Sequence, residues 1–264
     1  MSRDEVLIIR NLTMTFGGLK ALDNINLEVR KGEIVGLIGP NGAGKTTIFN
    51  CITGVYKPVD GDIFLHPPVG KARRLNGMAV HKIARLGVAR TFQNIRLFSH
   101  MTVLENVMVG RHSRGQSGVI GAILRDRKTK EEEEAIVRQS YAILEKVGLN
   151  AMVNELAKNL PYGDQRRLEI ARALATDPFL LLLDEPAAGM NPMETMGLAN
   201  LIRGLRDEGN LTILLIEHDM RLVMNLCDRI YVLDYGEKIA EGTPEEVRTN
   251  PQVIRAYLGE ECYA

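Results

Sequence analysis

The chain lacks three features that would restrict its class at once: an excess of charge, a cysteine cluster and a long apolar run. Lys plus Arg and Asp plus Glu both number 33, so the formal net charge is zero and nothing favours a nucleic-acid partner. The three cysteines, Cys51, Cys227 and Cys262, are too far apart to form a metal-ligand cluster or a redox pair, so we expect idle thiols in a reducing compartment. The longest purely aliphatic or aromatic run, Phe179–Leu183, is far short of the roughly 20 residues that span a bilayer.

Residues 1–10 also lack an apolar stretch of the length of a signal peptide, so the sequence predicts a cytosolic protein whose membrane role, if it has one, comes through a partner. The chain has 264 residues, of which 45% are hydrophobic and 25% charged. A globular chain of this size can bury a sufficient core without disulfides or a structural metal.

Short β-type runs alternate with helical patterns along the chain, which favours an α/β fold with a largely parallel sheet. Three runs, Ile34–Ile38, Leu180–Leu183 and Ile213–Ile216, are continuously apolar, as in strands that are covered on both faces. The expected strands are Val6–Ile9, Ile25–Val29, Glu33–Ile38, Phe179–Leu183, Thr212–Glu217 and Ile230–Leu233. The expected helices are Lys45–Ile52, Leu104–Val109, Lys130–Val147, Asp164–Ala175, Pro192–Glu208 and Met220–Leu226, with a short one from Pro244.

The middle of the chain, from about Thr102 to Asn159, has helical periodicity and no convincing strand, which predicts a helical subdomain. Within it, residues 111–130 hold six Lys or Arg and one acid, Asp126. Such a run is usually a solvated loop, here balanced by the acids of Glu131–Glu134. Contact with lipid headgroups or with another subunit is the alternative.

The most informative segment follows the apolar run Ile34–Ile38 and opens an expected helix. It matches the P-loop pattern G-x-x-x-x-G-K-[ST] in the context that this motif requires, and it reads Gly39, Pro40, Asn41, Gly42, Ala43, Gly44, Lys45, Thr46 and Thr47. The glycines let backbone N–H groups approach phosphate oxygens, and the helix adds the positive end of its dipole. We therefore expect nucleoside triphosphate binding, with Lys45 on the β and γ phosphates and the Thr46 hydroxyl on Mg²⁺.

Two adjacent carboxylates, Asp184 and Glu185, follow the apolar run Phe179–Leu183. Acids at the end of a buried strand are costly unless a cation is close. Considered alone, the pair would be interpreted as a solvated turn. In a chain with a P-loop, we expect Asp184 to join the magnesium shell and Glu185 to act as the general base on the attacking water.

From Leu7 to Gly259 the chain resembles the ATP-binding subunits of ABC transporters, because further motifs follow in that family's order. Gln93 is similar to the Q-loop glutamine, which binds magnesium or water, and His218 to the switch histidine, which contacts the γ-phosphate. Phe16 is similar to the aromatic residue on which adenine stacks, the alternative being a packed strand aromatic. The place of the signature sequence is taken by Leu160, Pro161, Tyr162, Gly163, Asp164 and Gln165, and the D-loop ends in Asn191.

The signature and the D-loop depart from the wider family. Pro161 and Tyr162 stand where the signature usually has Ser-Gly, and Asp164 stands in place of Gln, so the serine hydroxyl that donates to the γ-phosphate is lost. Backbone donors at the start of the next helix remain. We expect the Asp164 carboxylate to point away from the phosphate, toward Arg167. Asn191 stands where the D-loop usually has Asp, and it keeps hydrogen-bonding capacity but not the charge.

The altered signature, with Arg90–Phe98 and Val253–Gly259, is most similar to the ATPases of branched-chain amino acid importers, in particular to the longer one of each pair, which has a basic loop. This resemblance implies ATP and Mg²⁺ as cofactors and leucine, isoleucine and valine as transported solutes. It also implies a homodimer or, as in that group, a heterodimer with a second ATPase, on two membrane subunits at the cytoplasmic face of the inner membrane, served by a periplasmic binding protein. The alternatives are an ATPase of an amide, urea or lipopolysaccharide system, a non-transport ABC ATPase, and a subunit that binds ATP without hydrolysis.

The same resemblance implies a RecA-like P-loop core with an antiparallel β subdomain and an inserted α-helical subdomain. The expected core with its β subdomain comprises residues 1–93 and 160–246, and the helical subdomain comprises residues 94–159 with the basic loop 111–130. A helical tail is expected over residues 247–264. The side chains expected to receive a helix of the membrane subunit, unless they pack within the helical subdomain, are Leu97, Phe98, Met101 and Val103.

Overall fold

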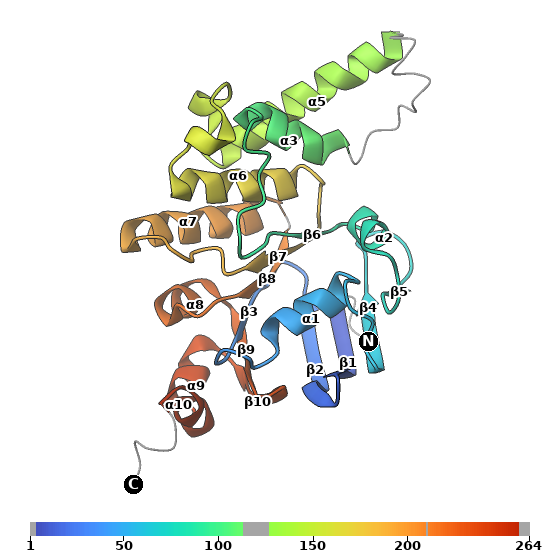
Figure 1. The fold of residues 1–264 in the computed structure, drawn as a ribbon, viewed down its shortest axis with the longest axis vertical. Helices are drawn as coiled ribbons and strands as arrows, with labels where there is room; N and C mark the ends of the chain where they lie inside the picture. Colours follow the sequence, from blue (N-terminus) through green and yellow to red (C-terminus); the bar gives the residue numbers. More distant parts are fainter. Residues whose placement is uncertain (1–3, 113–126, 210, 259–264) are drawn as a thin grey trace. The chain divides into compact units, whose positions relative to one another are not determined.

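The computed structural model describes residues 4–112, 127–209 and 211–258, which form two compact units. The core unit comprises Met1–Arg90 and Phe179–Ala264, and the helical unit comprises Thr91–Pro178. Figure 1 shows the elements of each unit in chain order. Within the described residues, no helix is both long enough and apolar enough to cross a membrane. Most of the basic loop, residues 113–126, and Cys262 lie outside the described residues.

The core unit contains a six-stranded sheet in the order β10–β9–β3–β8–β7–β6. Its neighbouring strands are parallel, except that β9 and β10 are antiparallel. Every residue of β3, β7 and β8 is buried, which confirms the prediction of strands covered on both faces. The strands are β3 (Ile34–Ile38), β6 (Val88–Arg90), β7 (Leu180–Asp184), β8 (Thr212–Ile216), β9 (Arg229–Asp234) and β10 (Glu237–Gly242).

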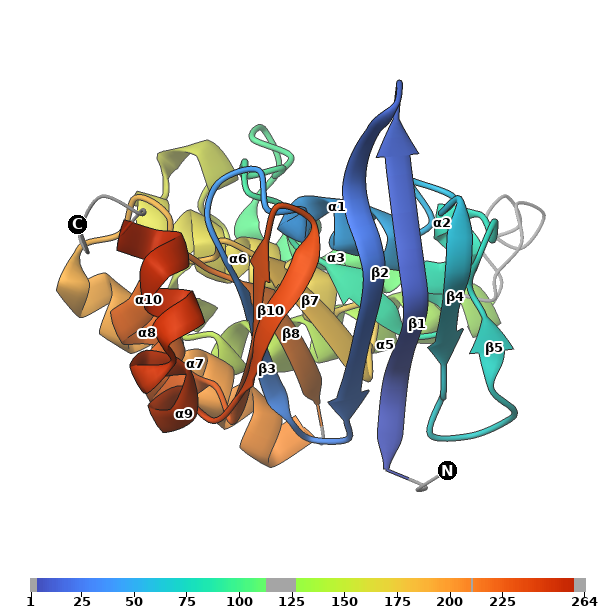
Figure 2. The same ribbon diagram turned by 90° about the horizontal axis from the view of Figure 1, so that it is seen from below.

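Helices on both faces of this sheet account for that burial. In Figures 1 and 2, α1 lies on one side of the sheet and α7 and α8 lie on the other. Strand β3 and α8 approach closely at Gly36, where a Cβ atom would lie 2.9 Å from Sγ of Cys227. The helices of the core unit are α1 (Lys45–Ile52), α2 (Val80–Arg85), α7 (Pro192–Gly209), α8 (Met220–Leu226), α9 (Pro244–Thr249) and α10 (Pro251–Leu258).

A second, antiparallel sheet of the core unit has the order β2–β1–β4–β5. Its strands β1 and β2 are much longer than the predicted Val6–Ile9 and Ile25–Val29, because their pairing continues to Phe16 opposite Leu19 at the turn. Side chains of both sheets and of α1 join one buried apolar cluster, so the P-loop helix is packed between them. The strands are β1 (Glu5–Phe16), β2 (Leu19–Arg30), β4 (Asp60–Leu65) and β5 (Arg73–Arg74).

The described residues of the helical unit form three helices and two short 3-10 turns. Helix α3 packs on both α5 and α6, and Gly110 permits the close approach of α3 to α6, because a Cβ atom there would lie 2.5 Å from the carbonyl oxygen of Arg172. The amide of Asn106, which is fully buried, binds the backbone of Phe98 through both its oxygen and its nitrogen. The helices are α3 (Val103–His112), α5 (Arg127–Lys146) and α6 (Tyr162–Leu174), and the 3-10 turns are Asn150–Met152 and Ala157–Asn159.

Two of the three cysteines lie within the described residues, and both are idle thiols, as expected. Cys51 and Cys227 are free and buried. Burial raises the pKa of Cys51 to about 12, and it raises the pKa of Cys227 as well. Neither thiol is therefore ionised near neutral pH.

Candidate functional site

The loop of residues 39–44 joins β3 to α1 and turns tightly at its glycines. Gly39 has φ 147° and Gly44 has φ 100°, conformations that side chains rarely adopt. A Cβ atom at Gly39 would lie 2.1 Å from the carbonyl oxygen of Leu233 in β9. Among the described residues, no side chain caps the start of α1, and its first turn holds no acid. The first backbone N–H groups of α1 can therefore bind an anion.

Lys45, the first residue of α1, is buried, and its ammonium group lies against this loop. Its Nζ donates hydrogen bonds to the carbonyl oxygens of Gly39 at 2.6 Å and Pro40 at 2.9 Å. Burial lowers the pKa of Lys45, and the negative charges of Glu185 and Asp184 oppose that shift. The P-loop lysine and the two carboxylates predicted for catalysis therefore belong to one charged site.

Asp184 is the last residue of β7, and its side chain is only 5% exposed. Its Oδ2 accepts a hydrogen bond of 2.7 Å from Nη2 of Arg90, at the end of β6. The buried carboxylate thus has the cationic partner that its burial requires. The sequence predicted a cation here but did not identify Arg90, because nothing in the motif shows which residue of a neighbouring strand faces Asp184.

Glu185 and His218 meet where β7 and β8 end. The two strands are parallel with Asp184 opposite Ile216, and Glu185 has φ 48°, which turns the chain out of the sheet. The Nδ1 atom of His218 lies 3.8 Å from Oε2 of Glu185. The side chains are 59% and 18% exposed, respectively, so water and a phosphate group can reach both. Their catalytic roles stay predictions.

Glu217, next to His218, is a buried carboxylate that the sequence analysis did not single out. It accepts hydrogen bonds from the N–H groups of Ala187 at 2.9 Å and His218 at 3.1 Å. Burial raises the pKa of Glu217, and these hydrogen bonds oppose that shift. The side chain therefore fixes the loop after Asp184 to the segment that carries His218. The signal that could have identified it is an acid directly after a continuous apolar strand, the same signal that identified Asp184.

Phe16 ends β1 and is 40% exposed, as the predicted stacking of adenine requires. Its ring contacts the edge of Tyr56, with ring centroids 5.1 Å apart and an interplanar angle of 71°. Tyr56 follows the C-terminal end of α1, so this contact ties Phe16 to the segment after that helix. The sequence analysis did not single out Tyr56, and the adenine contact of Phe16 stays a prediction.

Gln93 belongs to the helical unit, where α6 holds its backbone. Arg166 donates hydrogen bonds to the carbonyl oxygens of Phe92, at 2.9 Å, and of Gln93. Arg166 and Glu169 form an ion pair of 3.2 Å whose side chains are 3% and 2% exposed. Glu169 in turn accepts a hydrogen bond from the N–H group of Arg96. The side chain of Gln93 is exposed, and its role toward magnesium or water stays a prediction.

The signature segment forms the start of α6, which begins at Tyr162 rather than at the predicted Asp164. Pro161 precedes the helix with an extended ψ of 153°, and this places the first turn earlier than the acid alone suggested. Asp164 is in that first turn, where its charge suits the helix dipole. Nη1 of Arg167 lies 4.0 Å from Oδ1 of Asp164, so the carboxylate is close to Arg167 as expected. That it points away from the phosphate stays a prediction.

Two further signature side chains bind locally. Nε2 of Gln165 donates to the carbonyl oxygen of Leu160 at 2.9 Å. The hydroxyl of Tyr162 accepts a hydrogen bond from Arg166, also at 2.9 Å. The segment is therefore braced against the same arginine that holds the Gln93 backbone.

Asn191 begins α7 as its capping residue. Its Oδ1 accepts hydrogen bonds from the N–H groups of Met193 at 2.9 Å and Glu194 at 3.0 Å. The Glu194 carboxylate binds the N–H group of Asn191 in return, at 2.9 Å. The hydrogen-bonding capacity expected of Asn191 is thus used in a capping box.

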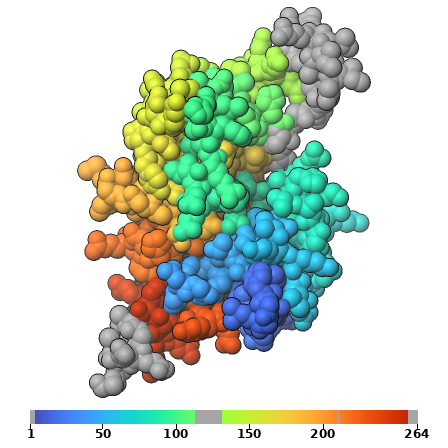
Figure 3. All heavy atoms as spheres, in the orientation of Figure 1, coloured from blue at the N-terminus to red at the C-terminus, as the bar shows by residue number. Residues whose placement is uncertain are grey.

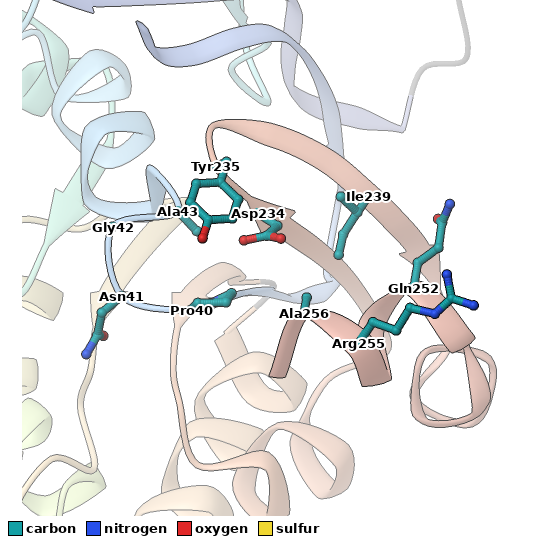
Figure 4. A pocket seen from close by; sticks show the side chains of 10 residues that line it. All are labelled: Pro40, Asn41, Gly42, Ala43, Asp234, Tyr235, Ile239, Gln252, Arg255 and Ala256. Atoms are coloured by element: carbon teal, nitrogen blue, oxygen red, sulfur yellow. The ribbon is translucent and has the colours of Figure 1, made fainter. Parts of the chain in front are cut away.

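Helix α10 lies beside the outer side of the P-loop, in the part of the chain where only a helical tail was predicted. The backbone of Gly39 is within hydrogen-bonding reach of the Tyr257 hydroxyl, and this contact opposes the upward shift of the Tyr257 pKa that burial causes. Figure 3 shows the light-blue segment around α1 beside the red C-terminal segment. Between them is a hollow of about 780 Å³ (Figure 4), lined by Pro40, Asn41, Gly42, Ala43, Asp234, Tyr235, Ile239, Gln252, Arg255 and Ala256.

The predicted docking surface of the helical unit needs one correction. Phe98 and Met101 are 46% and 37% exposed, and Leu97 is half-buried. Val103 is fully buried at the start of α3, because this helix packs against α5 and α6. The inclusion of Val103 in an exposed surface was therefore wrong.

Comparisons with known proteins agree with this arrangement. Residues 22–188 match the family described as ABC transporter, and residues 237–263 match one described as branched-chain amino acid ATP-binding cassette transporter. The chain is 53% identical over 255 residues to the high-affinity branched-chain amino acid transport ATP-binding protein LivG of Salmonella typhimurium, with 97% of this chain and 98% of LivG covered. It is 49% identical over 260 residues to BraF of Pseudomonas aeruginosa, with 98% and 100% covered.

Solved structures show the same fold. The ADP conformation of MJ1267, an ATP-binding cassette of an ABC transporter, gives a TM-score of 0.83 at 34% identity, with 97% of this chain and 99% of MJ1267 covered. A dimeric post-hydrolysis state of the cassette MJ0796, bound to ADP and Pi, gives 0.74 at 25% identity, with 90% and 98% covered. The predicted P-loop cassette fold, with its parallel sheet, antiparallel sheet and helical region, is thereby confirmed. The chain belongs to the family of ABC transporter ATP-binding proteins, in the group that contains LivG and BraF.

Proposed function

We propose that this chain is the ATP-hydrolysing subunit of an ABC importer for leucine, isoleucine and valine. The observation that carries the hydrolytic part is the meeting of Glu185 and His218, 3.8 Å apart, at the ends of two buried strands. Lys45 lies within electrostatic reach of Glu185. The solute is supported by LivG and BraF, which are named as branched-chain amino acid transport proteins and are similar over nearly the full length of the chain.

The triphosphate of ATP binds the backbone N–H groups of residues 39–47 and the ammonium group of Lys45, and the adenine stacks on Phe16. The reasons are the uncapped start of α1, the close turns at Gly39 and Gly44, and the exposed ring of Phe16. Lys45 exchanges its hydrogen bonds to the loop carbonyl oxygens for phosphate oxygens.

The donor atoms at the site also fit Mg²⁺. The described residues hold no group of three or more His, Cys, Asp or Glu able to bind a metal without other ligands. Mg²⁺ does not need such a cage, since it is usually bound through one or two carboxylates together with substrate phosphates and waters. The exposed hydroxyl of Thr46 and the carboxylate of Asp184 are hard oxygen donors of this kind, and Gln93 is a third candidate. Bound Mg²⁺ would neutralise charge that develops on the β and γ phosphates.

In the hydrolytic step, the Glu185 carboxylate accepts a proton from the water that attacks the γ-phosphate, while the bond from the γ-phosphorus to the bridging oxygen breaks and ADP leaves. His218 donates a hydrogen bond to the γ-phosphate, and Lys45 offsets its charge. A positioned general base of this kind contributes a factor of about 10²–10⁴ to the rate.

Two cassettes enclose the nucleotide in our proposal, and each offers its signature segment, Leu160–Gln165, to the P-loop of the other. The dimer of MJ0796 with ADP and Pi supports this arrangement. In this proposal, residues 1–93 and 160–246 form the nucleotide-binding part, and residues 94–159 transmit its state. Phe98 and Met101 contact a membrane subunit, which holds the ATPase at the cytoplasmic face of the membrane.

The test uses the ATPase purified with its membrane subunits and placed in vesicles with the binding protein. The variant Glu185→Gln should bind ATP with unchanged affinity, hydrolyse it about 10²–10⁴-fold more slowly and abolish uptake of labelled leucine. Glu208→Gln, at an exposed position of α7, is the matched control and should behave as the wild type. Near-normal turnover of Glu185→Gln would remove Glu185 as the base. Uptake of an amide or urea without uptake of leucine would overturn the proposed solute.

A further inference from the structure

Arg90 lies at the junction of three elements of the core unit, and none of the sequence motifs assigns it a role. It is the last residue of β6, after which the chain enters the helical unit. Its Nη2 donates to Oδ2 of Asp184 at 2.7 Å, and its Nη1 donates to Oδ1 of Asn50 at 2.7 Å. The side chains of Arg90 and Asp184 are 7% and 5% exposed, so this contact is shielded from solvent.

A cation–π contact with Phe49 also fixes the guanidinium group of Arg90. It lies over the ring of Phe49, 5.3 Å from the centroid, and Phe49 is fully buried in the apolar cluster around α1. Strand pairing places Arg90 opposite Leu182, two residues before Asp184 on β7. The position of Arg90 is therefore set by the sheet and its orientation by α1, before any ligand is considered.

The hydrogen bond from Arg90 to Asn50 connects Arg90 to the helix that carries Thr46. Asn50 lies four residues after Thr46 on α1, so the two side chains occupy the same face of the helix, one turn apart. Thr46 and Asp184 are the two residues of the core unit expected to bind Mg²⁺. One planar guanidinium group thus joins the helix that carries the first ligand to the strand that carries the second. A lysine, with a single nitrogen on a flexible stem, does not reproduce this rigid two-nitrogen geometry.

We propose that Arg90 is a positioning residue of the metal site, which fixes the orientation of the Asp184 carboxylate and its distance from Thr46. Because one carboxylate oxygen accepts the Arg90 hydrogen bond, the carboxylate cannot rotate freely and keeps one orientation toward the metal. This inference rests on the proposed binding of ATP with Mg²⁺. Loss of such an outer partner costs about 10–100-fold in metal affinity.

The experiment measures binding rather than turnover. A fluorescent ATP analogue is titrated into the full chain in EDTA, and Mg²⁺ is then titrated into the protein with ATP bound. Arg90→Lys should raise the Mg²⁺ concentration at half-saturation by about 10–100-fold and leave ATP affinity in EDTA within about twofold of the wild type. Asn50→Ala leaves the Asp184 contact in place and should shift the Mg²⁺ midpoint in the same direction by a smaller factor.

Arg229→Lys is the matched control. Arg229 also makes a two-pronged ion pair, with Glu33, whose side chains are each 13% exposed, but it lies on β9 and the structure shows no hydrogen bond from it to Asp184. It should lower stability and leave the Mg²⁺ midpoint unchanged. In the background of Asp184→Asn, Arg90→Lys should shift the midpoint no further, because both changes disturb the same ligand.

The outcomes separate the two proposals. A wild-type chain that binds no ATP, or whose nucleotide complex shows no Mg²⁺ saturation, would overturn the proposed site itself. If the wild type behaves as expected, an unchanged Mg²⁺ midpoint in Arg90→Lys and Asn50→Ala would overturn the role of Arg90 alone. An equal loss of ATP affinity in EDTA and in Mg²⁺ would do the same, since it would show a purely structural role.

Discussion

The buried pair of Arg166 and Glu169 in α6 offers the most direct test of how the helical unit is held together. Replacing Arg166 by Met keeps much of the side-chain volume and removes the guanidinium group. Glu169, only 2% exposed, would then be a buried acid that has lost the ion pair that now lies at 3.2 Å. The carbonyl oxygens of Phe92 and Gln93 would lose their donor in the same step.

The expected magnitude follows from these contacts. Removing one partner of a buried ion pair costs about 3–5 kcal/mol, because the remaining charge stays desolvated. Each hydrogen bond to a carbonyl oxygen is worth about 0.5–1.5 kcal/mol, but these terms overlap with the first and do not add to it. For a chain of this size, a loss of about 3–5 kcal/mol lowers the melting temperature by about 6–20 °C.

The assay is urea denaturation followed by circular dichroism, with calorimetry to locate the transition. The control is Arg138→Met, since the Arg138–Glu134 pair is 69% and 71% exposed and its loss should cost less than about 0.5 kcal/mol. The double variant Arg166→Met/Glu169→Leu should recover most of the stability, because a buried pair replaced on both sides by apolar groups is often neutral. A cost below about 1 kcal/mol for Arg166→Met, or no recovery in the double variant, would refute the reasoning.

Three further changes probe the core unit. Gly39→Ala should weaken ATP binding by about 10–100-fold, because its Cβ would meet the Leu233 carbonyl oxygen at 2.1 Å; binding of a fluorescent ATP analogue within threefold of the wild type would contradict this. Burial raises the pKa of Glu217 above its ordinary 4.5. Below pH 4.5 the side chain is therefore protonated in both the folded and the unfolded chain, and the folded chain loses stability as the pH rises from there through the raised pKa. Denaturation of Glu217→Gln should therefore show a shallower fall in stability above pH 4.5, and a parallel pH profile would speak against the shift. Tyr257→Phe removes the hydroxyl that meets the Gly39 backbone and should lower stability by about 0.5–1.5 kcal/mol in thermal unfolding; an unchanged midpoint would show that the contact is unimportant.

Sequence reasoning succeeded where the chemistry lies in one continuous segment. The P-loop is local, because a strand, a turn of glycines and a helix start follow each other within fifteen residues or so, and α1 was predicted with its observed bounds, Lys45–Ile52. The strands β7 and β8 were also identified, since a strand that is buried on both faces has an unbroken run of apolar residues.

Sequence reasoning failed where a strand is polar or where two hydrogen-bonded residues are distant in the sequence. Strand β4 reads DGDIFL and β10 reads EKIAEG, and such edge-like sequences carry too little apolar pattern to be distinguished from loops. Helix α2, with six residues, is too short to show a period. Arg90 lies 94 residues before its partner Asp184, and only the strand order reveals that they meet.

The position of β3 in its sheet has a consequence for the synthesis of the chain. Its two neighbours are β8, which pairs Ile213 with Ile34, and β9, which pairs Arg229 with Val35. Both neighbours come from the last fifth of the sequence, so the strand that leads into the P-loop stays unpaired until β8 has left the ribosome. At about 5–20 residues per second, the roughly 170 residues between the loop and the end of β8 take about 9–34 s to make. During that time the unpaired apolar strand β3 is exposed and prone to aggregation with other chains. ATP can stabilise the complete cassette but not the nascent chain.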